Sequence, residues 1–140
     1  EGREVAIEQI VGAYHELQRR HPFMLVEGAG GLLVPIDEKT TMADLAERLE
    51  LPVLLVARAS LGTINHTMLT LEACASRGLD VVGVVLSHSS GKISKADERN
   101  VELLRESLAE QLIGEVHPQA EPEQTAPRDA GLDAVLSLAR

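Results

Sequence analysis

The feature that most constrains the fold is a short apolar run that ends in an acid and a glycine-rich turn, Phe23–Gly31. The four apolar residues at 23–26 have the length and composition of a buried strand in a parallel sheet. Ligands of open α/β sheets bind at the carboxyl ends of strands, where Glu27 follows directly. Glycines at 28, 30 and 31 permit a left-handed backbone and can aim amide groups at an anion. The stretch therefore predicts a phosphate or magnesium site, although a tight turn with an exposed glutamate fits the same residues.

Apolar runs and helical periodicity alternate along the rest of the chain, which indicates βαβ units. The expected elements, in chain order, are a helix at 4–20, a helix at 42–49 capped by Thr41, a strand at 53–57, a helix at 64–77 stopped by Gly78, a strand at 81–86, a helix at 95–111, a strand at 112–116 and a terminal helix at 132–140. The strand at 53–57 has no polar alternation, so we expect both of its faces to be covered. The prediction is one α/β domain over residues 1–140, a parallel sheet with helices on both faces.

Charge and composition exclude two classes of partner. The formal net charge of −9 repels nucleic acid and anionic membrane surfaces, and an aromatic content of 1% leaves no platform for stacking bases. No apolar run is long enough to span a membrane, and the first residues do not resemble a secretory signal. We therefore expect a cytoplasmic protein that binds neither nucleic acid nor membrane.

A second candidate site is the turn Ser60–His66, which follows a predicted buried strand and opens a helix. The amides of residues 62–65 and the side chain of Asn65 suit a carboxylate or a phosphate at the positive end of the helix dipole. The same residues also fit a simpler role, in which Thr63 or Ser60 caps the helix.

The sequence lacks the motifs of several other kinds of functional site. The G-x-G at Gly28 meets Leu33 at the third fingerprint position, so dinucleotide binding is disfavoured, and neither G-x-x-x-x-G-K-[ST] nor G-x-S-x-G occurs. The five histidines are dispersed, and no two of them stand at metal-ligand spacing with a partner cysteine or acid, which argues against zinc. A phosphate and magnesium site remains the best-supported interpretation.

Two stretches, Leu25–Pro35 and Leu61–Thr70, together resemble the dethiobiotin synthases, and the likeness runs from about residue 10 to about residue 120. The resemblance implies a homodimeric α/β protein of the P-loop NTPase kind that uses MgATP to join CO2 to diaminopelargonic acid. An amine carbamate is phosphorylated in that family, and the second amine then closes the ureido ring.

The resemblance also implies roles for individual residues. Glu27 would be a magnesium ligand and, with Gly30, part of the catalytic centre, while Gly28, Ala29 and Gly30 would lie against ATP. The residues that would hold the substrate carboxylate, reaching into the partner subunit's site, are Gly62, Thr63 and Asn65. The remaining nucleotide contacts would be Ser87, His117, Pro118 and Gln119.

This sequence departs from the family in two ways. Ser87 stands where the family usually has an asparagine that recognises the base, so base selectivity is open. The Walker-A loop and the first strands of the sheet have no counterpart in the 140 residues. We therefore expect the C-terminal portion of a longer enzyme, inactive by itself. The alternatives are a non-catalytic dimerisation or ligand-binding module of the same fold, or a fragment related to the cobyrinic acid amide synthases.

Overall fold

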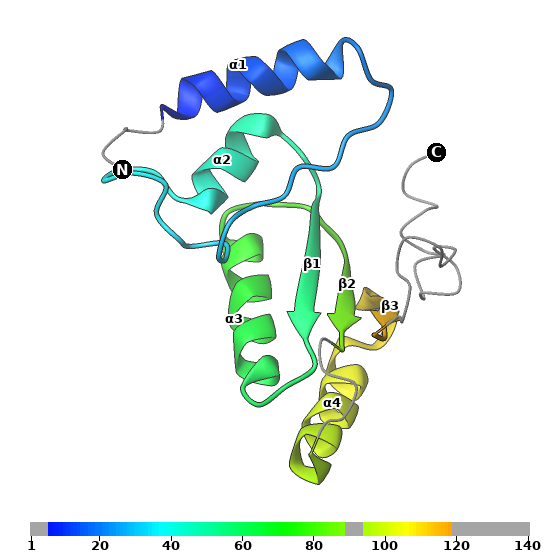
Figure 1. Cartoon of the computed structure of the whole chain (residues 1–140). Coiled ribbons are helices and arrows are strands. Elements are labelled where there is room, and N and C mark those ends of the chain that lie inside the picture. The colour runs from blue at the N-terminus through cyan, green and yellow to red at the C-terminus, as the bar shows by residue number, and fades with distance from the viewer. Residues whose placement is uncertain (1–5, 89–93, 119–140) are drawn as a thin grey trace.

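Three parallel strands form one sheet in the computed structural model, which describes residues 6–88 and 94–118. They are β1 (Val53–Arg58), β2 (Val81–Ser87) and β3 (Leu112–Val116), and they lie in the order β1-β2-β3 (Figure 1). All three were predicted from apolar runs. Because the strands are parallel, their carboxyl ends meet at one edge of the sheet, where both predicted anion sites were expected.

Four α-helices accompany the sheet: α1 (Ile7–Gln18), α2 (Met42–Leu49), α3 (Thr63–Ser76) and α4 (Lys95–Leu108), the last followed by the 3-10 turn η1 (Ala109–Gln111). Each of them was predicted, and the observed bounds differ from the predicted ones by up to three residues. The expected helix at 132–140 lies outside the described residues. No described helix combines the length and the apolar character that crossing a bilayer requires.

The helix boundaries follow from local chemistry. The side chain of Thr41 accepts a hydrogen bond from the Asp44 amide at 3.3 Å, and the Asp44 carboxylate accepts one from the Thr41 amide at 2.6 Å, which is a capping box. At the end of α3, Gly78 takes a φ of +68°, a left-handed conformation that stops a helix.

Helices α3 and α4 pack on the same face of the sheet and on each other. The buried cluster between them contains Ala57, Ala59, Val84, Leu86, Val101, Leu104 and Leu108. Helices α1 and α2 form a separate cluster with each other, near the amino ends of the strands (Figure 1). On the other face of β1, Val56 is 61% exposed. The prediction that both faces of this strand are covered is therefore wrong, because two of the four helices pack elsewhere.

The predicted strand at 23–26 is also wrong. These residues form no strand, their backbone makes no hydrogen bond within the described part of the chain, and Leu25 is 76% exposed. A strand is held by the hydrogen bonds of a neighbour, and β1 pairs only with β2 among the described strands. An apolar run without a neighbour remains irregular.

Candidate functional site

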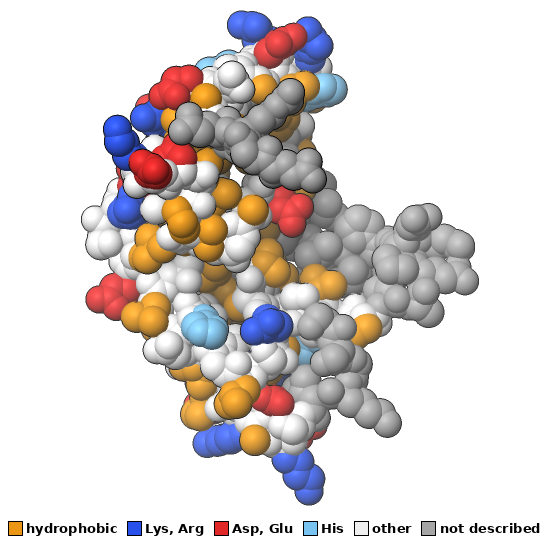
Figure 2. Space-filling model, turned by 60° about the vertical axis from the view of Figure 1, so that its left-hand side comes forward, with side chains coloured by type: hydrophobic (Ala, Val, Ile, Leu, Met, Phe, Trp, Pro, Cys, Tyr) orange, Lys and Arg blue, Asp and Glu red, His pale blue; other side chains and the backbone are white. Residues whose placement is uncertain are grey.

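A cavity of about 700 Å³ lies between the glycine turn, the second half of β1 and the first turns of α3. Its lining includes Gly30 and Thr63, one residue from each of the two predicted sites. Exposed hydrophobic side chains gather on the face shown in Figure 2, and Leu33, Val56, Leu61 and Leu69 from the cavity lining are all more than half exposed. The structure thus brings the two motifs together across about 30 residues of sequence.

Gly30 is required by the shape of the turn. Its φ is +84°, and a Cβ at this position would lie 2.9 Å from the Val34 side chain. Gly28 and Gly31 do not have positive φ, and the Gly31 amide donates to the Ala29 carbonyl at 3.2 Å. Of the three glycines that permit a left-handed backbone, only Gly30 uses it, and the Gly31 amide is taken up within the turn. The anion site at this turn stays a prediction.

Glu27 lies in an irregular, exposed segment, and it does not line the cavity, nor do Gly28 and Ala29. Mg²⁺ keeps several waters and takes one or two carboxylates together with phosphate oxygens. A single exposed carboxylate next to the turn fits that pattern as one ligand. Within the described residues, Glu27 belongs to no cluster of three potential metal ligands.

The start of α3 has an unfilled set of donors. Gly62 is the N-cap residue with a φ of +85°, and no side chain caps the helix. Within the described residues, the amides of Ile64 and Asn65 have no acceptor. Thr63 is 4% exposed, and its Oγ1 has no hydrogen-bond partner among the described residues. The simpler role, capping by Thr63 or Ser60, is therefore wrong, and a buried unpaired hydroxyl of this kind costs about 1–3 kcal/mol unless a ligand meets it.

Arg58 was missed by the sequence interpretation. It ends β1 at the cavity, and its Nε donates to Ser60 Oγ at 2.8 Å. A guanidinium beside an N-terminal helix turn raises the preference of the site for an anion. The available signal was a basic residue that closes an apolar strand directly before the predicted anion-binding turn.

Of the other predicted substrate and nucleotide residues, none of those that the structure describes lines this cavity. Gly62 is partly buried, and Asn65 is exposed in the first turn of α3. Ser87 ends β2 and pairs with Val116 of β3, at the carboxyl edge of the sheet. His117 and Pro118 follow β3 directly and are exposed. Gln119 lies outside the described residues.

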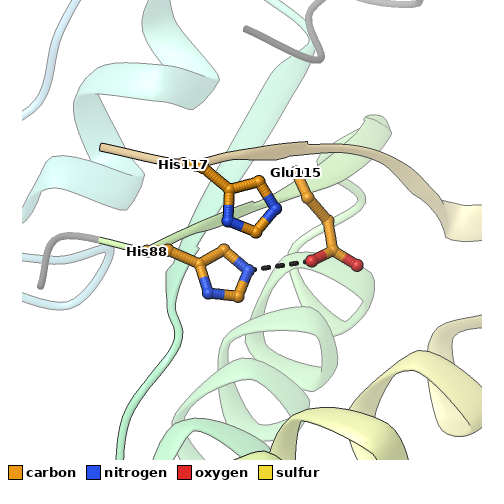
Figure 3. A group of neighbouring side chains, drawn as sticks. All are labelled: His88, Glu115 and His117. Atoms are coloured by element: carbon orange, nitrogen blue, oxygen red, sulfur yellow. Dashed lines mark hydrogen bonds and ion pairs between the residues drawn. The ribbon is translucent and has the colours of Figure 1, made fainter. Parts of the chain in front are cut away.

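The carboxyl edge of β2 and β3 also holds a cluster that was not predicted (Figure 3). His88 Nε2 lies 2.8 Å from Glu115 Oε2, and the His88 ring stacks on His117 with ring centroids 4.2 Å apart. Arg105 on α4, with further help from His88, lowers the pKa of Glu115 from 4.5 to about 2 against the effect of burial. Spacing along the sequence did not reveal this cluster, because His88 and Glu115 are 27 residues apart.

Comparison with known proteins identifies the family to which the chain belongs. The model of the AAA domain family matches residues 1–126. This chain belongs to that family. The match and the parallel sheet with its flanking helices confirm the predicted α/β fold of the P-loop NTPase kind.

The relatives are proteins named ATP-dependent dethiobiotin synthetase BioD, which confirms the resemblance. The protein of Anaeromyxobacter dehalogenans (strain 2CP-1) is 57% identical over 89 residues, 64% of this chain and 40% of the relative. The protein of Aquifex aeolicus is 43% identical over 106 residues, which are 76% of this chain and 48% of the relative. The protein of Anoxybacillus flavithermus is 38% identical over 117 residues, which are 83% of this chain and 53% of the relative. The chain thus spans about half the length of these relatives.

Proposed function

We propose that this chain is the C-terminal part of an ATP- and Mg²⁺-dependent ligase that forms the ureido ring of dethiobiotin from diaminopelargonic acid and CO2. The names of the relatives and the two motifs support this reaction. The site supports it chemically, because phosphoryl transfer depends on positioning and on charges aimed at the transferring group.

The observation that carries the proposal is the donor set at the start of α3. This set consists of the buried Thr63 hydroxyl and the amides of Ile64 and Asn65, which have no partner among the described residues, and Thr63 lines the same cavity as Arg58. This set matches a carboxylate, which accepts several hydrogen bonds and is attracted by the helix dipole. Gly62, Thr63 and Asn65 are accordingly assigned to the carboxylate of diaminopelargonic acid.

The glycine turn is assigned to the nucleotide side. Glu27 would hold Mg²⁺ together with phosphate oxygens, and Gly28, Ala29 and Gly30 would lie along ATP. An ion held there would neutralise charge that develops on the phosphates. The remaining nucleotide contacts are assigned to residues at and after the carboxyl ends of β2 and β3, namely Ser87, His117, Pro118 and Gln119.

The rest of the phosphate site would come from a Walker-A segment of the whole enzyme. Within the described part of the chain, β1 pairs with β2 alone, so the backbone on its other side is open. A further parallel strand fits there. We expect little turnover by these 140 residues alone, since they offer no P-loop lysine to balance the triphosphate.

The test is to replace Thr63 by Val and by Ser in the complete enzyme. Thr63→Val keeps the shape and removes the hydroxyl, so the KM for diaminopelargonic acid should rise roughly 10-fold or more, with the KM for ATP unchanged. Thr63→Ser restores the hydroxyl and should restore most of the affinity. An equal rise in both KM values, or no rise in either, would contradict the substrate assignment.

A further inference from the structure

Three metal-ligating side chains meet at the carboxyl edge of β2 and β3, away from the cavity. One ligand atom from each of His88, Glu115 and His117 lies within 4.8 Å of the other two (Figure 3). It is the one group of three such residues in the described ranges 6–88 and 94–118. His88 is 8% exposed, so this histidine is part of the folded interior.

Strand register explains why these residues converge. Leu86 of β2 pairs with Glu115 of β3, and the ladder continues to His88, whose amide donates to the Val116 carbonyl at 2.8 Å. Side chains two apart on a strand lie on the same face. His88 follows Leu86 by two residues and His117 follows Glu115 by two, so the parallel pairing itself places both rings beside the carboxylate.

We propose that His88, Glu115 and His117 bind one divalent first-row transition-metal ion, of which Zn²⁺ is the representative. Two imidazole nitrogens and one carboxylate oxygen are the donors that such ions accept, whereas Mg²⁺ prefers oxygen alone. Three protein ligands leave a fourth position for water or for a ligand. The site is distinct from the one assigned to Glu27, although it shares His117 with the proposed nucleotide contacts. The proposal does not depend on the proposed reaction.

The ligand atoms are close enough together for one ion of this kind. Tetrahedral zinc with bonds of about 2.0–2.1 Å holds its ligand atoms roughly 3.3 Å apart. His88 Nε2 and Glu115 Oε2 are 2.8 Å apart, and one ligand atom from each of the three residues lies within 4.8 Å of the other two. His117 is exposed at the surface, and its ring stacks on that of His88.

Arg105 has two effects on such a site. Its Nε and Nη2 donate to the two oxygens of Glu115, at 2.5 and 2.8 Å, which holds the carboxylate in position. Hydrogen bonds of this outer kind orient metal ligands. The guanidinium charge also opposes a second cation, so we expect weaker binding than at a four-ligand structural zinc site.

The experiment titrates tag-free protein with Co²⁺, followed by visible absorption, and then with Zn²⁺ in competition. Nucleotide is left out because ATP chelates both ions. We expect one ion per chain at about pH 7.5 and markedly weaker binding at about pH 5.5, where protons compete for the imidazoles.

Variants separate this site from incidental binding. His117→Ala changes an exposed residue, and Glu115→Gln keeps the shape of the carboxylate without its charge; each should weaken binding by about 10-fold or more. His15→Ala, an exposed histidine on α1, is the matched control and should bind like the wild type. Circular dichroism verifies that each variant is folded. The proposal fails if the wild type binds no stoichiometric ion, or if His117→Ala and His15→Ala bind equally well.

Discussion

The guanidinium of Arg105 on α4 binds both carboxylate oxygens of Glu115 on β3. The pair joins a helix to the edge strand of the sheet, and it holds the pKa of Glu115 at about 2, below the ordinary 4.5. Charge-assisted bonds made in pairs are stronger than single surface contacts. The geometry of this edge therefore depends on an ionised Glu115.

Glu115→Gln should lower the free energy of unfolding by about 1–2 kcal/mol near pH 7, a value reduced for the solvent exposure of Arg105. Since the folded-state pKa is depressed, the stabilisation is complete above about pH 4.5 and is lost as the pH falls toward 2. Urea unfolding at several pH values should show the wild type and the variant converging in acid. Glu102→Gln, which removes an exposed pair with Arg99, is the control and should change stability little at any pH.

Gly83→Ala should destabilise the sheet by about 1–3 kcal/mol through overpacking. A Cβ at Gly83 would lie 2.6–2.8 Å from three side-chain atoms of Ile113 on β3. Gly12→Ala, in α1 with nothing within 4 Å of its Cβ, is the opposite control and should stabilise by about 0.5–1 kcal/mol. Thermal unfolding measures both. Adding Ile113→Ala to Gly83→Ala should show strong coupling; simple additivity would mean that no clash exists.

Glu27→Gln in the complete enzyme should reduce magnesium-dependent turnover by orders of magnitude while the fold persists, because it removes one exposed charge. Phosphate release coupled to diaminopelargonic acid, measured at varied magnesium, reports the effect. Glu38→Gln, an exposed acid in the following loop, serves as the control. An unchanged magnesium dependence in Glu27→Gln would refute the role as a metal ligand.

Asn65→Ala should raise the KM for diaminopelargonic acid far more than the KM for ATP, at a cost of roughly 1–3 kcal/mol for a bond to a charged group. If the α3 turn serves the partner subunit, mixing this variant with Glu27→Gln should create one intact site per heterodimer. Activity should then partly return. With subunit exchange verified by mass, no recovery would mean that the turn acts within its own subunit.

Local sequence determined most of the secondary structure. The capping box at Thr41 and the glycine stop at Gly78 act within a few residues, and the runs that became β1 and β2 read as strands without knowledge of their neighbours. The run at 23–26 has a similar composition but forms no strand, because a strand also needs a partner outside itself.

The candidate sites also divide into those that local sequence reveals and one that depends on tertiary structure. The glycine turn and the opening of α3 are contiguous motifs, so the sequence by itself identified Gly30 and Thr63 before the structure showed that they line one cavity. The His88, Glu115 and His117 cluster spans two strands that are distant in sequence, and only the spacing of Glu115 and His117, two residues apart, hinted at a shared face. Tertiary structure decided the rest, because the register between β2 and β3 determines which side chain from the distant strand stands beside the carboxylate.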